Sequence, residues 1–357
     1  LAIIGAGISG LNAALTLYDA GYQSTIYESS DRIGGRMYSD STSWDSGQIS
    51  EWCGEFIDSG HTSIINLAQR FGLNLINENK AQLASSSDTL YFFNKYYSVQ
   101  QADIDFQPIL QILQSQNKAA PFPTTWNSYT STGLNLDNTS LYDWIELYVP
   151  GGHKSNMGQY IDTAYNQEYG LDTKLQSSLN LVYLLYPQPT PKPTHTQIFG
   201  ASDQAYHING GNDLLPKAIA KYLPAENIKT NYKLISIAKF QNNFLLTFNT
   251  KSGSQTVFAD RVILSLPFSV LRNIDFSQAG FDARKIKAIN ELGYGTNSKL
   301  ILQFSERYWN RNGIWGIGNG NIFTEIKIST SQNIKGKSNN QFTIKLLGGT
   351  VGDIYED

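Results

Sequence analysis

The first ten residues contain the feature that most limits how this chain can fold. Residues 1–4, Leu-Ala-Ile-Ile, form a short apolar run rich in β-branched side chains, which is typical of a buried strand. They lead directly into Gly5-Ala-Gly-Ile-Ser-Gly10, and residues 11–18 then take helical spacing. A strand, a G-x-G-x-x-G turn and a helix in this order make up the dinucleotide-binding fingerprint. The sequence therefore predicts an α/β domain that opens with a Rossmann-like β-α unit.

The residues of this turn have distinct expected roles. Gly5 permits the tight turn, Gly7 lets a pyrophosphate approach the backbone, and Gly10 lets the helix pack on the strand. The phosphates are expected at the helix start, where unpaired N–H groups and the helix dipole favour an anion. The predicted contacts of the dinucleotide here are Gly5, Ala6, Gly7, Ile8, Ser9 and Gly10.

A second apolar run, residues 23–27, ends at Glu28. This position is about 20 residues beyond the turn, where a carboxylate can bind the ribose hydroxyls. No arginine stands beside it, which disfavours a 2′-phosphate and hence NADP.

A further glycine pair follows in Tyr27-Glu-Ser-Ser-Asp-Arg-Ile-Gly-Gly-Arg36. This segment resembles the flavin-containing amine oxidase family, which includes monoamine oxidases, polyamine oxidases and L-amino acid oxidases. The glycines admit close backbone approach, and Arg36 offers a guanidinium fork suited to a pyrophosphate. An NAD-binding unit does not need this second segment, so FAD is the expected cofactor, with Gly35 and Arg36 among its contacts.

Further blocks match the same family in the same order, and they imply the domain organisation. The blocks are residues 207–216, 259–267 and 292–299. The resemblance implies a Rossmann-like FAD-binding domain, 1–80 and 201–285, interleaved with an α+β substrate domain, 81–200 and 286–357. The family's third flavin-binding segment has no counterpart in the sequence, so the chain is expected to be C-terminally incomplete.

The resemblance also assigns a catalytic residue. Lys299 matches the lysine that holds a water near flavin N5 in most of the family. It precedes an apolar run, residues 300–304, and burial would lower its pKa and suit it to proton work. The alternative is a strand-edge lysine whose head reaches solvent.

The block Glu51-Trp-Cys-Gly-Glu-Phe-Ile-Asp58 resembles the segment that passes the flavin ring. The backbone of Gly54, Glu55 and Phe56 is the expected flavin contact. Cys53 replaces a small residue of the family, and we expect it to be a buried apolar filler rather than a covalent attachment point. Leu234 matches the position whose backbone meets the adenine side of FAD, although it could also be ordinary core.

Asp58 and Glu168 match acids of plant polyamine oxidases that face a cationic substrate. Carboxylates in a tunnel would attract ammonium groups. The alternatives are that Asp58 caps the helix expected at residues 62–71 and that Glu168 is a solvated helix end. L-amino acid oxidases typically carry an arginine, which holds the substrate carboxylate, at the position that follows Gly54 in this chain. Because this chain has Glu55 there, a simple amine is preferred as substrate over an α-amino acid.

Composition excludes several other classes of function. A formal net charge of −3 without a basic run argues against nucleic acid as a partner, and four scattered histidines give no metal-ligand spacing. The longest mainly apolar run, roughly residues 179–186, is shorter than the ~20 residues that cross a bilayer. A single cysteine allows no internal disulfide and leaves the compartment open, with the cytoplasm slightly favoured. Because the chain begins at Leu1 without methionine, an upstream signal is left unassessed.

The expected function is FAD-dependent oxidation of an amine, with the amine and O2 as partners and hydrogen peroxide as a product. Three alternatives stay open: an L-amino acid oxidase, another flavoenzyme of this fold such as a desaturase or protoporphyrinogen oxidase, and a degenerate non-catalytic flavin-binding protein. Neither the identity of the amine nor the oligomeric state follows from the sequence.

Overall fold

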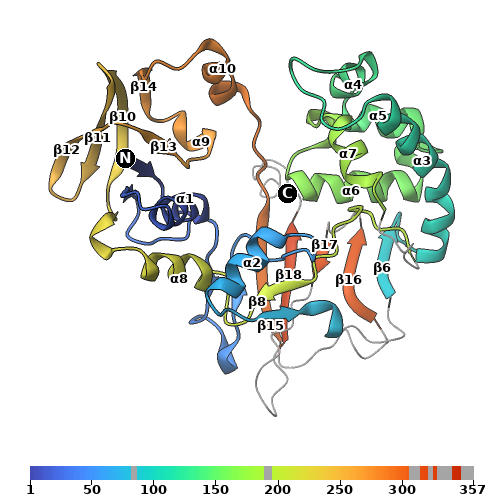
Figure 1. The fold of residues 1–357 in the computed structure, drawn as a ribbon. Coiled ribbons are helices and arrows are strands. Elements are labelled where there is room, and N and C mark those ends of the chain that lie inside the picture. Colours follow the sequence, from blue (N-terminus) through green and yellow to red (C-terminus); the bar gives the residue numbers. More distant parts are fainter. Residues whose placement is uncertain (82–86, 189–194, 305–313, 321–324, 328–339, 347–357) are drawn as a thin grey trace, which may run out of the picture. The chain divides into compact units, whose positions relative to one another are not determined.

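The chain folds into two compact units, each built from separate stretches of sequence (Figure 1). The computed structural model describes residues 1–81, 87–188, 195–304, 314–320, 325–327 and 340–346. Unit 1 comprises Leu1–Ile57, His61–Ile76 and Tyr206–Gly293, and unit 2 comprises Asp58–Gly60, Asn77–Ala205 and Tyr294–Asp357.

Unit 1 contains a parallel four-stranded sheet in the order β13-β1-β2-β9. Its strands are β1 (Ala2–Ile4), β2 (Thr25–Tyr27), β9 (Ile228–Lys229) and β13 (Val262–Leu264). β1 is short and wholly apolar, and it is buried along its whole length between two neighbouring strands. Helix α1 (Ile8–Asp19) connects β1 to β2 and contacts α8 (Leu214–Tyr222). The predicted opening β-α-β unit is present.

A second sheet of unit 1 has the order β12-β11-β10-β14. Its strands are β10 (Lys233–Phe240), β11 (Asn243–Thr250), β12 (Gly253–Ala259) and β14 (Asp275–Gln278). Strands β10, β11 and β12 pair antiparallel, and the side chains of Leu246 and Phe248 on β11 are fully buried in the core of unit 1. The remaining elements are β3 (Ser39–Asp40), η1 (Asp45–Gly47), β4 (Ser50–Glu51), α2 (Thr62–Arg70), β5 (Leu75–Asn77), β8 (Tyr206–Ile208), η5 (Ala225–Asn227), α9 (Phe268–Leu271) and α10 (Ala283–Glu291).

Unit 2 combines a helical layer with a mixed sheet in the order β15-β18-β17-β16-β6-β7 (Figure 1). The strands are β6 (Ser87–Phe92), β7 (Lys95–Tyr97), β15 (Ser298–Phe304), β16 (Ile314–Gly320), β17 (Glu325–Lys327) and β18 (Asn340–Leu346). The helices are η2 (Glu78–Ala81), α3 (Val99–Ala119), α4 (Ser131–Asp137), α5 (Leu141–Tyr148), η3 (Gly152–Lys154), α6 (Asn156–Tyr169), η4 (Thr173–Leu175) and α7 (Ser178–Leu185). Trp144, Tyr165 and Phe106 are nearly or fully buried among these helices and form the centre of the core.

Two helices of unit 2 differ from the residue pattern because other side chains cap them. The pattern predicts a helix over 138–148 capped by Asp137 or Asn138, but α5 begins at Leu141, since the Ser140 hydroxyl accepts from the Asp143 N–H. A single helix expected over 173–186 is divided into η4 and α7, because the Ser177 hydroxyl caps a new start. The sequence also predicts an extended, proline-rich linker over residues 187–193, and most of this stretch lies outside the described residues.

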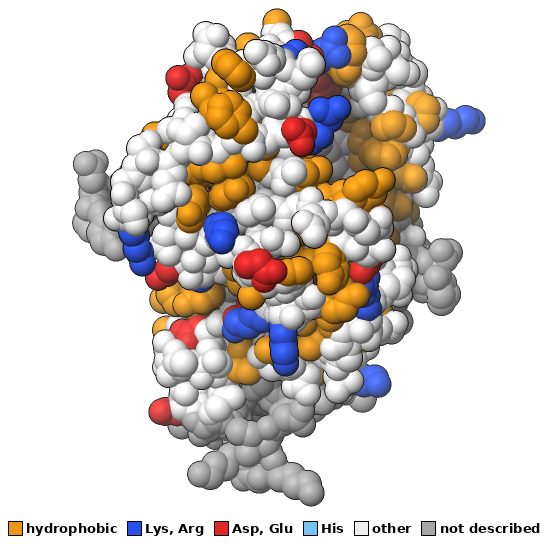
Figure 2. All heavy atoms as spheres, turned by 60° about the vertical axis from the view of Figure 1, so that its left-hand side comes forward, with side chains coloured by type: hydrophobic (Ala, Val, Ile, Leu, Met, Phe, Trp, Pro, Cys, Tyr) orange, Lys and Arg blue, Asp and Glu red, His pale blue; other side chains and the backbone are white. Residues whose placement is uncertain are grey.

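The described part of the chain contains neither a candidate membrane-spanning helix nor a candidate metal-binding cluster. No described helix is both long and apolar enough to cross a bilayer. No three His, Cys, Asp or Glu side chains within the described ranges form a group that could hold a metal ion. On the face shown in Figure 2, the described Lys and Arg side chains lie scattered among Asp and Glu and form no basic stripe of the kind that follows a phosphate backbone.

Candidate functional site

The glycine turn of unit 1 joins β1 to α1 with very little space between strand and helix. Gly5 has φ of +103°, a conformation that other residues rarely adopt. A Cβ atom at Gly10 would lie 2.0 Å from the Gly5 carbonyl oxygen, a distance that no real side chain tolerates. Gly10 therefore allows α1 to start directly against the end of β1.

The second glycine pair lies against the first turn, although the two are far apart in sequence. The Gly34 N–H donates to the Ala6 carbonyl at 2.8 Å, and Gly7 and Gly34 form a parallel β-bridge. Gly35 and Arg36 follow directly, and both are exposed. Both glycine segments therefore border the start of α1.

Glu28 reaches the same place from the end of β2. Its Oε2 accepts from the Ala6 N–H at 2.8 Å, and its Oε1 accepts from the Ser30 N–H at 2.9 Å. The Glu28 carbonyl accepts from the Tyr232 N–H, which places the carboxylate near the beginning of β10. Leu234, two residues further, is buried in the core of unit 1 and pairs with Phe248 of β11.

These residues fit the ADP half of FAD. The start of α1 is capped by Gly7 with no side-chain hydrogen bond, so its N–H groups point toward an anion site. A Cβ atom at Gly7 would meet only the Gly35 Cα, at 4.0 Å, so the space beside this backbone is open to a pyrophosphate. Glu28 places a carboxylate at the adjoining strand end, which is the kind of group that a ribose hydroxyl pair requires.

The block expected to pass the flavin ring begins at Glu51, the last residue of β4. Gly54 is exposed and donates its N–H to the Arg36 carbonyl at 3.3 Å, while Glu55 is buried and Phe56 is half-buried. The expectation that Cys53 is a buried filler is wrong, because its side chain is exposed in the turn between β4 and Gly54.

Glu51, the first residue of this block, is a buried acid that carries no assigned role in the sequence patterns. It is 6% exposed, and its Oε1 and Oε2 each lie 2.8 Å from the Ser39 hydroxyl. Burial raises the pKa of Glu51 to about 7. The nearby negative charge of Glu55 raises it further, whereas hydrogen bonds from the Asn212 N–H and the Ser39 hydroxyl lower it, as does the proximity of His207. A lone glutamate in the sequence gives no signal for such burial.

The raised pKa of Glu51 predicts a pH-dependent stability. Between the ordinary value of 4.5 and about 7, the folded protein keeps a proton that the unfolded chain releases. The free energy of unfolding should therefore fall as pH rises through this window, by about 3 kcal/mol. Denaturant titrations at the two ends of the window measure this change. Glu51→Gln should remove that part of the pH dependence, and an unchanged slope in this variant would contradict the assignment.

In unit 2, Lys299 is the second residue of β15, half-buried and in register with Lys345 of β18. The chain just before it rests on the last turn of α6. The Asn297 amide donates to the Gln167 carbonyl, and the Thr296 N–H donates to the Gly170 carbonyl at 2.8 Å. These contacts fix the start of β15 against the helix end that carries Glu168.

Glu168 is exposed at this C-terminal end of α6, whereas Asp58 is half-buried. Asp58 Oδ1 accepts from the Ser202 hydroxyl at 2.9 Å and from the Gln204 N–H at 2.7 Å. It does not cap α2, whose N-cap is His61 with no side-chain hydrogen bond. The capping alternative is therefore wrong, because the Asp58 carboxylate is turned to residues 202–204.

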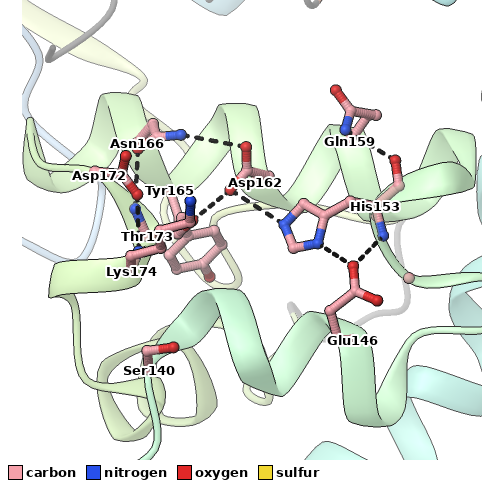
Figure 3. Close-up of polar contacts among 12 residues, drawn as sticks. Ser140, Glu146, His153, Gln159, Asp162, Tyr165, Asn166, Asp172, Thr173 and Lys174 are labelled. Atoms are coloured by element: carbon pink, nitrogen blue, oxygen red, sulfur yellow. Dashed lines mark hydrogen bonds and ion pairs between the residues drawn. The ribbon is translucent and has the colours of Figure 1, made fainter.

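A polar network braces the middle of α6 (Figure 3). The His153 ring lies between two carboxylates, with Nδ1 2.6 Å from Glu146 Oε1 and Nε2 3.5 Å from Asp162 Oδ1. The ring also stacks on Tyr142 with centroids 4.0 Å apart. The backbone N–H and ring of His153 hold the pKa of Glu146 below its ordinary value. This network joins α5, η3 and α6.

Residues 8–340 match the sequence model of a family described as flavin containing amine oxidoreductase. The chain belongs to this family. Membership confirms the resemblance inferred from the motifs, and FAD is the cofactor that the family uses. The two-domain FAD fold expected from the sequence is confirmed by solved amine oxidases of the same architecture.

The proteins similar to this chain include curated sequences and solved structures. Among curated proteins, an L-amino-acid oxidase of Vipera ammodytes ammodytes is 25% identical over 318 residues, covering 88% of this chain and 63% of the relative. A putative L-amino-acid oxidase of Bacillus subtilis (strain 168), YobN, is 25% identical over 359 residues, covering 92% and 68%. The chain thus spans about three fifths of the first relative's length.

The second group consists of solved structures. Putrescine oxidase bound to putrescine has a TM-score of 0.81 at 17% identity, covering 100% of this chain and 77% of that one. Cyclohexylamine oxidase from Brevibacterium oxydans IH-35A has a TM-score of 0.80 at 18% identity, covering 99% and 76%. At these identities the likeness concerns the fold.

Proposed function

We propose that the complete protein is an FAD-dependent oxidase of primary or secondary amines. One observation carries the proposal. In a chain of the amine oxidoreductase family, hydrogen bonds bring three segments together at the start of α1: the Gly5–Gly10 turn, the Gly34–Gly35 pair and Glu28. When bound, FAD would supply the redox chemistry, which is hydride acceptance from the carbon that bears a neutral amine and reoxidation by O2, and water would hydrolyse the imine product.

In this proposal, the residues of the chain bind the cofactor and orient it. The backbone of residues 5–10, with Glu28, Gly35 and Arg36, holds the ADP half, and the backbone of Leu234 meets the adenine. The backbone of Gly54, Glu55 and Phe56 passes the ring, and Lys299 holds a water beside it. No side-chain nucleophile is required.

The preference for an amine over an α-amino acid rests on charge near the block at 51–58. The residue after Gly54 is Glu55, an acid where a substrate carboxylate would need a cation. Glu168 is exposed at the end of α6, adjoining the segment that leads to Lys299. Asp58 and Glu168 would attract ammonium groups of the substrate.

One observation favours a second candidate, L-amino acid oxidation. The curated relatives above are described as L-amino-acid oxidases, one of them as putative. An arginine from another part of the protein would then have to hold the substrate carboxylate.

The test is reduction of the flavin without oxygen. Full-length holoprotein is mixed anaerobically with an aliphatic diamine, a monoamine or an L-amino acid, and bleaching of the visible flavin absorption is followed. We expect amines to bleach the flavin and oxygen then to yield hydrogen peroxide. Bleaching by L-amino acids alone would replace this proposal with the second candidate, and bleaching by neither would indicate a desaturase-type enzyme or a non-catalytic protein.

The same experiment tests the role of Glu168 when its charge is removed by substitution. Glu168→Gln should raise the diamine concentration needed for half-maximal bleaching by about 2- to 5-fold, the range expected for an exposed ion pair. Glu226→Gln, which removes an exposed acid of unit 1, is the matched control and should leave that concentration unchanged. Equal effects of the two variants would remove Glu168 from the substrate site.

A further inference from the structure

Asn212 is a buried amide that the sequence patterns leave without a role. It follows the glycine pair Gly210-Gly211 and precedes α8. It is 3% exposed, among the most buried polar residues of unit 1. A polar side chain at this depth requires partners for its amide groups.

The side chain of Asn212 joins two segments that are far apart in sequence. Its Nδ2 donates to the Gly54 carbonyl at 3.1 Å and to the Glu55 carbonyl at 2.7 Å. Its Oδ1 accepts from the Ile208 N–H at 2.9 Å. Both amide protons are therefore used on the block that passes the flavin ring, while the oxygen anchors the amide to its own turn.

The backbone of Asn212 is itself braced. Its N–H donates to Glu51 Oε1 at 2.8 Å, and the Ser39 hydroxyl lies at the same distance from that oxygen. The Ser39 hydroxyl in turn accepts from the Asp213 N–H at 3.0 Å. The β3–β4 pair thus holds the turn from which Asn212 reaches the Gly54 and Glu55 carbonyls.

We propose that Asn212 is a positioning residue of the flavin site, which holds the backbone of Gly54 to Phe56 in the conformation that receives the cofactor ring. The inference rests on the part of the proposed function that places this backbone against FAD. Fixing the two carbonyls before binding reduces the ordering that binding requires. Asn212 affects cofactor binding only by holding the backbone of Gly54 to Phe56, and it takes no part in the reaction itself.

The test compares two substitutions in the full-length protein. Asn212→Asp keeps the size and the acceptor for Ile208 but turns an oxygen toward two carbonyl oxygens. Asn212→Ala removes the donors without adding charge. Both should raise the dissociation constant of FAD by about 10- to 100-fold, the effect of unsatisfied buried groups. At saturating FAD, the bound flavin should show shifted visible absorption bands, which a general loss of stability would not produce.

Asn166→Asp is the matched control, because Asn166 makes comparable amide contacts in unit 2, with Asp162 and Thr173. It should lower the thermal midpoint and leave FAD affinity and absorption bands unchanged. Parental affinity and bands in both Asn212 variants would overturn the inference, as would failure of both to fold, since Asn212 would then support the unit as a whole. An unaltered protein that binds FAD but is not reduced by amines would overturn the proposed function only.

Discussion

Gly7→Ala is expected to weaken FAD binding strongly while leaving the apo-protein as stable as the parent. The backbone of Gly7 has φ of −70° and ψ of 173°, which alanine adopts without strain. The added Cβ meets no protein atom closer than 4.0 Å, but it enters the space through which a pyrophosphate would approach the α1 N–H groups. Losing such charge-assisted hydrogen bonds should raise the dissociation constant of FAD by about 10- to 100-fold.

Gly10→Ala is the informative contrast. Its Cβ would lie 2.0 Å from the Gly5 carbonyl oxygen and 2.7 Å from the Ser265 hydroxyl, so strand and helix would have to separate. The free energy of unfolding should fall by about 3 kcal/mol or more, and FAD binding should fall with it. Thermal unfolding of both apo-variants, with FAD titrations, separates the two effects. Parental FAD affinity in Gly7→Ala would mean that the phosphates do not lie at this turn.

The parts of the fold that the sequence predicts well are those specified by contiguous residues. The glycine turn and Glu28 can be predicted from the sequence because the strand, turn, helix and acid follow one another at the spacing that the dinucleotide-binding motif requires. Helix starts were less predictable where several caps compete, since Asp137, Asn138 and Ser140 all have suitable side chains. Packing decides among them, and Ser140 caps α5.

Contacts between distant segments could not be predicted from one sequence. Asn212 and Gly54 are 158 positions apart, and Asp58 and Ser202 are 144 apart, so only the folded chain shows that they are bonded. The exposure of Cys53 had no sequence signal either, because cysteine is among the residue types that are most often buried. The supporting contacts of the candidate site are therefore the part that required a structure.

Asn297 illustrates how such contacts bear on Lys299, the proposed catalytic residue. A Cβ at Gly295 would lie 2.2 Å from the Tyr169 carbonyl oxygen, so the chain passes directly over the end of α6. The Asn297 amide then pairs a C-terminal carbonyl of that helix, which would otherwise lack a helical partner. The backbone that leads to Lys299 is thus held by the close approach of Gly295 to α6 and by the hydrogen bond from the Asn297 amide. The position of the Lys299 backbone is therefore fixed relative to the end of α6.

Lys299→Met in the full-length protein is expected to slow the half-reaction with oxygen by about 100-fold, at the lower end of the effects of lost proton-transfer groups. Methionine keeps much of the volume and the apolar stem, so the packing of β15 should change little. The amine head and the water it holds would be lost. Anaerobic bleaching by an amine should change much less, because the neutral substrate needs no protein base. Stopped-flow measurement of the two half-reactions separates these effects, with Lys239→Met, an exposed lysine of β10, as the matched control. An unchanged oxygen half-reaction in Lys299→Met would leave Lys299 as a strand-end lysine, and the proposed water would have to be held by another group.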